Sequence, residues 1–162
     1  MPADRIPATA AIRVLREQGV VFSAHEYAYV EQGGTAASSA ALGLDEHAVV
    51  KTLIFETDTR DPLIVLMQAT ARSRAKGLAR AIGARSVRPC NPQVAEKHSG
   101  YQVGGTSPFG TRRSMPVYLE RSVLELERIW INGGRRGLLV GLASSELQRV
   151  LSPTLVDVGL PG

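Results

Sequence analysis

Cysteine is almost missing from this sequence: 162 residues include one cysteine, Cys90, and three histidines. One cysteine cannot form a disulfide within the chain, and it is more typical of a small half-buried residue than of a nucleophile. The histidines, His25, His47 and His98, are far apart and lack the spacing of a zinc site. We therefore expect neither a metal nor another cofactor.

Long hydrophobic runs are also missing. No stretch approaches the roughly 20 apolar residues of a membrane-spanning helix. Near the N-terminus, Asp4, Arg13, Arg16 and Glu17 interrupt the apolar core that a secretory signal needs. Together with the single cysteine, these absences predict a cytoplasmic protein with no membrane partner.

Lysine is scarce, whereas arginine is abundant. The chain has 19 basic and 15 acidic residues, a formal net charge of +4, and only three lysines. Guanidinium groups match phosphate oxygens well, so RNA is a candidate partner. The alternative is that so modest a charge only improves solubility.

The hydrophobic pattern predicts an α+β fold in a single domain, residues 1–162, with its core at about 8–158. Helices are predicted at 8–18, 35–43, 73–83, 91–98 and 144–151. Strands are predicted at 20–30, 49–55, 63–68, around 87, and at 115–120, 128–132, 138–142 and 155–158. We expect a mixed, largely antiparallel, curved and barrel-like sheet with peripheral helices, in a monomer.

Lys51 stands in the middle of VVKTLIF, residues 49–55, a run that is otherwise apolar and β-branched. Strand alternation places mostly apolar residues on both faces, so the lysine stem should be partly desolvated. Burying an unpaired ammonium group costs several kcal/mol, which a paired acid, contact with solvent or a lowered pKa relieves. Two interpretations stay open: a functional lysine, or one that reaches water along the apolar surface.

Two glycine-rich segments are further candidates. The loop GYQVGGTSPFG, residues 100–110, could bring backbone amides close to an anion or a developing oxyanion, or could be a tight hairpin corner. It matches neither of the usual nucleotide-binding glycine motifs, and the chain has no GxSxG serine-hydrolase motif. NGGRRG, residues 132–137, reads as a hairpin turn.

A pair of arginines accompanies each of these two segments. Arg112 and Arg113 follow the loop, and Arg135 and Arg136 lie in the turn. We expect these four residues to contact RNA phosphates from the rim of one cleft. Scattered surface charge is the alternative.

VVKTLIF, GYQVGGTSPFG and NGGRRG, in this order and spacing, resemble the YbaK/EbsC family of free-standing aminoacyl-tRNA deacylases. That family is related to the editing domain of bacterial prolyl-tRNA synthetases. The resemblance implies hydrolysis, without metal, of the ester that joins a wrongly attached amino acid to tRNA, best known for cysteine on the proline tRNA. It implies aminoacyl-tRNA as partner, with prolyl-tRNA synthetase in a transient complex.

The resemblance also implies roles for individual residues. Lys51 and the backbone of Gly104 are the implied catalytic groups, and in cysteine-specific members the thiol of the substrate itself is thought to attack the ester. The implied substrate-binding residues are Tyr27, Thr52, Gly105, Ser107 and Pro108.

Two positions depart from the family pattern. Leu139 stands where cysteine-specific members often have an aspartate, and the segment 31–43 lacks an expected aromatic residue. The resemblance implies that both lie in the pocket that selects the amino acid, so alanine, serine and cysteine remain candidates. A non-catalytic module that binds tRNA ends or nucleotides is the main alternative. A hydrolase of small aminoacyl esters or adenylates is the third.

Overall fold

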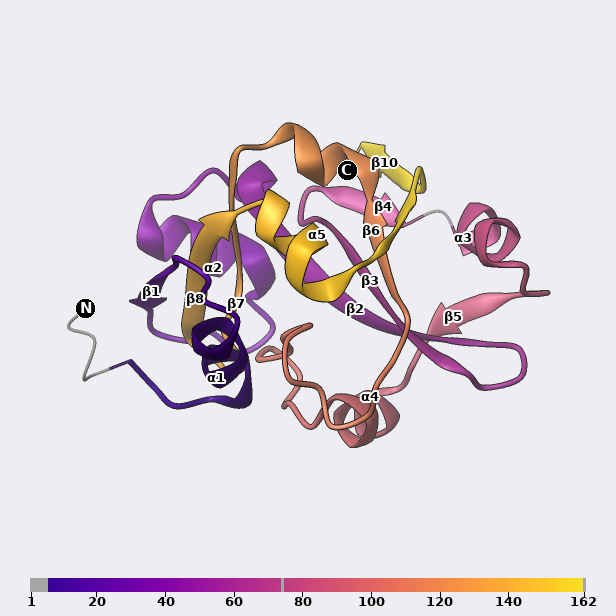
Figure 1. The fold of residues 1–162 in the computed structure, drawn as a ribbon, viewed down its shortest axis with the longest axis horizontal. Helices are drawn as coiled ribbons and strands as arrows, with labels where there is room; N and C mark the ends of the chain where they lie inside the picture. The colour runs from indigo at the N-terminus through magenta and orange to yellow at the C-terminus, as the bar shows by residue number, and fades with distance from the viewer. Residues whose placement is uncertain (1–5, 74, 162) are drawn as a thin grey trace.

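The computed structural model describes residues 6–73 and 75–161 (Figure 1). Its α-helices are α1 (Ala10–Glu17), α2 (Gly34–Leu42), α3 (Ala75–Ile82), α4 (Pro92–Ser99) and α5 (Ser145–Leu151). Its strands are β1 (Ser23–Glu26), β2 (Val49–Thr57), β3 (Pro62–Gln68), β4 (Ala71–Ser73), β5 (Val87–Pro89), β6 (Val117–Glu120), β7 (Arg128–Asn132), β8 (Leu138–Ala143), β9 (Thr154–Val156) and β10 (Gly159–Pro161). Two short 3₁₀ helices, η2 (Glu46–Ala48) and η3 (Arg121–Glu125), precede β2 and follow β6.

Eight strands form one mixed sheet in the order β1-β8-β7-β2-β3-β6-β9, with β5 pairing beside β2. Antiparallel ladders join β1 to β8, β7 to β8, and β2 to both β3 and β5. Parallel ladders join β2 to β7, β3 to β6, and β6 to β9. The predicted α+β fold with a mixed sheet is confirmed, although the sheet is curved and open rather than a closed barrel.

Strand β2 runs through the centre of the molecule and has apolar residues on both faces. Val50 and Ile54 belong to the larger hydrophobic cluster, which also buries Ile12 and Leu15 of α1. Phe55 belongs to a smaller cluster that contains Leu78 of α3. Figure 1 shows α1 and β1 at one end of the long axis and α3 and β5 at the other. The predicted alternation along residues 49–55 is therefore confirmed, and Lys51 lies on the Phe55 face.

The first strand is shorter than the sequence predicts. The expected strand at 20–30 is reduced to β1, whose ladder with β8 ends at the pair Glu26–Leu138. The ladder stops at Glu26, although the N–H of Tyr27 still donates a hydrogen bond to the carbonyl of Gly137 (2.9 Å), the residue before β8. Beyond that bond the chain turns toward the glycine-rich loop, where the Tyr29 hydroxyl lies beside Gly104. In the described part of the chain, no helix has the length and apolar character needed to cross a membrane.

The carboxylate of Glu120 anchors the C-terminal segment to β6. It is only 5% exposed and accepts hydrogen bonds from the backbone N–H of Val158 (2.7 Å) and of Ser122 (2.8 Å). Glu120→Ala should destabilise the protein by about 1–3 kcal/mol for each buried donor left unpaired. Urea unfolding measures this cost, with Glu125→Ala on the exposed side of η3 as control. Equal midpoints for the two variants would contradict the assignment.

Candidate functional site

A cavity of about 930 Å³ opens beside the central strand. Strand β2 pairs with β7 only at Val49 and Val50, and with β5 only from Phe55 to Thr57. Between these two ladders, the edge of β2 from residue 51 to 54 has no neighbouring strand in the part of the chain that the structure describes. The cavity fills this gap, and its walls come from the segment 27–38, β2, residues 89–95, the glycine-rich loop and the ends of β7 and β8.

Lys51 lines the cavity and is held by the first residue of β4, which lies outside the lining. Its ammonium group donates a hydrogen bond to the backbone carbonyl of Ala71 (2.5 Å). Burial lowers the pKa of the Lys51 amine, and the negative charge of Glu46 partly opposes that shift. Lys51 forms no ion pair within the described residues. An ammonium group has three N–H donors, so two remain for a ligand in the cavity.

Gly104 lies in the cavity wall in a conformation that favours glycine. Its φ is +88°, and a Cβ added there would lie 2.6 Å from the Tyr29 hydroxyl oxygen. Its carbonyl accepts a hydrogen bond from the Asn132 amide (3.1 Å), whereas its N–H has no partner among the described residues. A fixed loop with an unused N–H is suited to binding an oxyanion.

Asn132 is a site residue that the sequence analysis interpreted only as part of a turn. Its side-chain oxygen accepts hydrogen bonds from the N–H groups of Gly134 (2.7 Å) and Arg135 (3.1 Å), while its amide nitrogen donates to Gly104. One side chain therefore fixes the NGGRRG turn and the glycine-rich loop against each other. Its position directly before the two glycines was the available signal.

The predicted substrate-binding residues separate into two groups. Tyr27 and Thr52 line the cavity. Gly105, Ser107 and Pro108 are buried and lie outside the lining, where they shape the loop, and their contact with substrate stays a prediction. The N–H of Gly105 donates to the carbonyl of Gln102 (2.8 Å). The Ser107 hydroxyl accepts a hydrogen bond from the N–H of Phe109 (3.1 Å).

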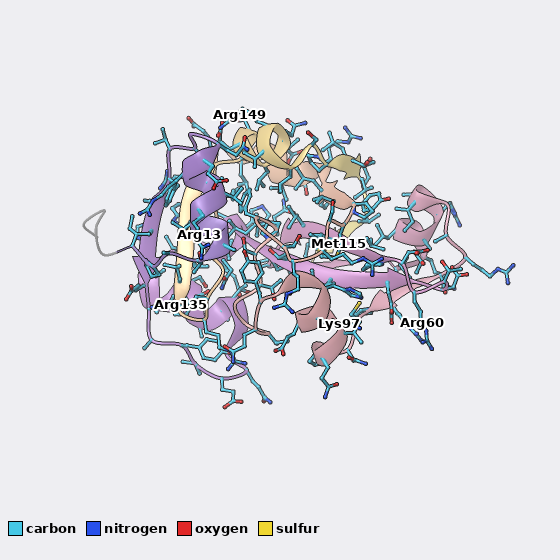
Figure 2. All side chains as sticks on the ribbon, turned by 60° about the horizontal axis from the view of Figure 1, so that its bottom comes forward. Arg13, Arg60, Lys97, Met115, Arg135 and Arg149 are labelled. Carbon is cyan, nitrogen blue, oxygen red and sulfur yellow. The ribbon has the colours of Figure 1, made fainter. Side chains whose placement is uncertain are left out.

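The four predicted RNA-contacting arginines have different surroundings, and their contact with RNA stays a prediction. Arg136 alone lines the cavity, where its guanidinium lies 4.8 Å from the centre of the Tyr29 ring and its Nε donates to the carbonyl of Val103 (2.7 Å). Arg135, labelled in Figure 2, belongs to the turn before β8 and lies 3.7 Å from the carboxylate of Glu26. Arg112 and Arg113 are exposed but are not part of the cavity wall.

Two acidic side chains of the lining, the Cys90 thiol and the Tyr27 phenol, have a raised pKa. Burial raises the pKa of the Cys90 thiol to about 11, with the charge of Glu56 adding to the shift and that of Arg88 opposing it. Burial also raises the pKa of the Tyr27 phenol. At neutral pH neither group is an anion, so neither is activated as a nucleophile. Within residues 6–73 and 75–161, no cluster of His, Cys, Asp and Glu could hold a metal ion.

Comparison with known proteins identifies relatives along most of the chain. The model of the aminoacyl-tRNA editing domain family matches residues 31–150. An Enterococcus faecalis protein named "Putative Cys-tRNA(Pro)/Cys-tRNA(Cys) deacylase EbsC" is 29% identical over 151 residues, which cover 93% of this chain and 92% of that protein. The "Uncharacterized protein YwhH" of Bacillus subtilis is 24% identical over 144 residues, 88% of each chain.

Solved structures share the fold. The crystal structure of the hypothetical protein APE2540 superimposes with a TM-score of 0.85 and 21% identity, covering 93% of this chain and 99% of that one. A crystal structure described as "a putative trans-editing enzyme for prolyl tRNA synthetase" gives a TM-score of 0.81 with 21% identity, covering 96% and 99%. The resemblance drawn from the three sequence motifs is confirmed.

Proposed function

The chain belongs to the aminoacyl-tRNA editing domain family, and from this premise we propose that it is a trans-editing hydrolase that cleaves the ester of mischarged aminoacyl-tRNA. The observation that carries the proposal is the placement on one cavity of Lys51 and the N–H of Gly104, which has no partner within residues 6–73 and 75–161. Both groups are donors fixed by other contacts before substrate arrives. Such fixed donors lower the barrier of ester hydrolysis because they meet the negative charge that develops on the carbonyl oxygen.

The reaction needs no nucleophile from the protein. Water, or a nucleophile on the substrate, adds to the ester carbonyl carbon, and the resulting oxyanion is stabilised by the Gly104 N–H and the charge of Lys51. The bond to the ribose oxygen then breaks, and that oxygen takes a proton. With water as the nucleophile, the products are the free amino acid and a tRNA with a free terminal hydroxyl.

The pocket favours a small neutral amino acid. Leu139 is 4% exposed and forms part of the cavity wall. An apolar side chain at this position offers no hydrogen bond to a polar substituent, so alanine, serine and cysteine are the substrates to compare. We place the protein in the cytoplasm as a monomer, with prolyl-tRNA synthetase in a transient complex that would supply the tRNA selection.

Release of amino acid from the proline tRNA charged in turn with cysteine, alanine, serine and proline tests the proposal. We expect one of the three small non-cognate amino acids to be released well above the uncatalysed rate, and prolyl-tRNA to survive. Affinity for the tRNA should fall steeply with salt, whereas hydrolysis of small aminoacyl esters or adenylates would not show this dependence. If tRNA is bound but every ester survives, the protein is a binding module.

Leu139→Asp should change which amino acid is released. A carboxylate in the wall favours a substrate with a hydrogen-bond donor, so the ratio of kcat/KM for alanyl over cysteinyl ester should fall about tenfold or more. Leu139→Asn is the matched control because it has a similar shape without the charge. Thermal unfolding of both variants checks that burying the new polar group has not unfolded the protein. An unchanged ratio in Leu139→Asp would remove residue 139 from the specificity pocket.

A further inference from the structure

The glycine-rich loop turns sharply at residues 102–105. The N–H of Gly105 donates to the carbonyl of Gln102 (2.8 Å), which closes a β-turn with Val103 and Gly104 at its centre. Gly104 has a φ of +88°, while Val103 has a negative φ. This combination is a type II turn, which differs from the commoner type I turn mainly in its central peptide, rotated by roughly 180°.

The two peptides that flank the centre of this turn are each held through both their carbonyl and their N–H. In the peptide before Val103, the carbonyl closes the turn and the N–H donates to the carboxylate of Glu96 (3.1 Å). In the peptide after Gly104, the carbonyl accepts from the Asn132 amide (3.1 Å) and the N–H closes the turn. Neither peptide can rotate without breaking two hydrogen bonds.

The central peptide, between Val103 and Gly104, is held through its carbonyl alone. This carbonyl accepts a hydrogen bond from Nε of Arg136 (2.7 Å). The N–H, which is the proposed oxyanion donor, has no partner within the ranges 6–73 and 75–161. Because the carbonyl and the N–H of a trans peptide point in opposite directions, the bond from Arg136 also sets the direction of the Gly104 N–H.

The backbone of the turn does not select this direction by itself. A glycine adopts the φ of about −90° that a type I turn needs as readily as the positive φ of a type II turn. In the type I form, the Val103 carbonyl would replace the Gly104 N–H on its side of the turn. A carbonyl there would repel the developing oxyanion that the N–H stabilises.

Arg136 is itself fixed against the loop. Its guanidinium lies 4.8 Å from the centre of the Tyr29 ring, and the hydroxyl of that ring lies beside Gly104. The backbones of the turn and the loop also touch, because a Cβ at Gly105 would lie only 2.7 Å from the Arg136 nitrogen. Arg136 forms no ion pair with any residue that the structure describes, so no carboxylate competes for its Nε.

We propose that Arg136 is a positioning residue, which keeps the Val103–Gly104 peptide in the orientation that offers the Gly104 N–H to the ester. The proposal rests on the proposed function, because this N–H acts on the carbonyl oxygen of the ester to be cleaved. It assigns Arg136 a task different from the phosphate contact expected from the sequence. A positioning residue changes kcat, whereas a phosphate contact changes KM and its dependence on salt.

Two uncharged substitutions separate these roles. Arg136→Gln keeps an N–H donor at the place of Nε, since in both side chains a nitrogen follows Cδ, whereas Arg136→Met has a methyl group there. We expect Arg136→Met to lower kcat about tenfold, the usual contribution of a hydrogen bond to a charged group, with KM for the charged tRNA unchanged. Arg136→Gln should stay within about threefold of the wild type. Arg80→Met, exposed on α3, is the control.

An NMR spectrum without substrate tests the orientation independently of turnover. Selective ¹⁵N labelling of glycine gives one signal for each of the 16 glycines, and the Gly104 signal is identified by its loss in Gly104→Ala. It should move or broaden in Arg136→Met, because the peptide then samples both orientations. It should stay near its wild-type position in Arg136→Gln, which loses the same guanidinium contact with Tyr29.

Equal losses of kcat in the two variants, or a raised KM with a smaller salt dependence in both, would show that the charge acts on tRNA and would overturn the positioning role. An equal shift of the Gly104 signal in both variants, or no shift in either, would overturn it even if the esters are hydrolysed. A signal that moves only in Arg136→Met, in a protein that leaves every ester intact, would support the positioning role and refute the proposed hydrolase instead.

Discussion

Lys51→Ala is expected to slow release of the amino acid by about 100- to 1,000-fold, the usual cost of removing one fixed group that stabilises an oxyanion. The amine is half-buried, bonded to the Ala71 carbonyl and directed by β2 into the cavity. Single-turnover deacylation of the charged tRNA measures the loss. Lys51→Met keeps the length of the stem without the charge and should be as inactive, whereas Lys76→Ala, exposed on α3, should match the wild type.

The pH profile separates the two roles that a lysine could have. Burial lowers the pKa of Lys51 from its ordinary value of 10.5. If the ammonium charge acts, the rate above uncatalysed hydrolysis should decline as pH rises through that lowered pKa. A rate that instead increases through the same range would mean that the neutral amine acts as a base. In Lys51→Arg any residual activity should not show this decline, because a guanidinium group stays charged.

Gly104→Ala should lower kcat/KM by about 100-fold, comparable to the loss of one oxyanion donor. The new Cβ would lie 2.6 Å from the Tyr29 hydroxyl oxygen and 3.1 Å from Cζ, the ring carbon that carries this oxygen. Residue 104 also has a φ of +88°, which favours glycine. The loop or Tyr29 must therefore move, and the Gly104 N–H moves with the loop.

Gly43→Ala is the matched control for that change. Gly43 has a φ of +66°, but among the described residues no atom lies within 4 Å of an added Cβ, and it ends α2 outside the cavity lining. The Gly43→Ala substitution should lower the free energy of unfolding by about 1 kcal/mol and leave the deacylation rate unchanged. Full activity of Gly104→Ala would show that this amide does not bind the ester.

Short-range sequence patterns were sufficient to predict much of the fold. Period-two alternation in VVKTLIF placed Lys51 on the face of Phe55, and helical periodicity placed Ile12 and Leu15 in the core. The helix that begins after Asn91 was predicted from its cap, and the Asn91 side chain accepts a hydrogen bond from the N–H of Val94 (2.9 Å). These features depend on residues within a few positions of each other.

The site depends on contacts between distant segments. No local pattern shows that β7 leaves β2 after Val50 and that β5 joins it only at Phe55, yet this interruption creates the cavity. The same holds for Asn132 bonding to Gly104 and for Arg136 alone, of four arginines, reaching the lining.

The sequence by itself therefore determined the element types, the face of β2 that carries Lys51, and the motifs that mark the family. The tertiary structure alone decided which of those motif residues meet around one cavity. The physical reason is that periodicity sets the direction of a side chain relative to its own strand, while the ending of a ladder depends on which edges meet across the fold.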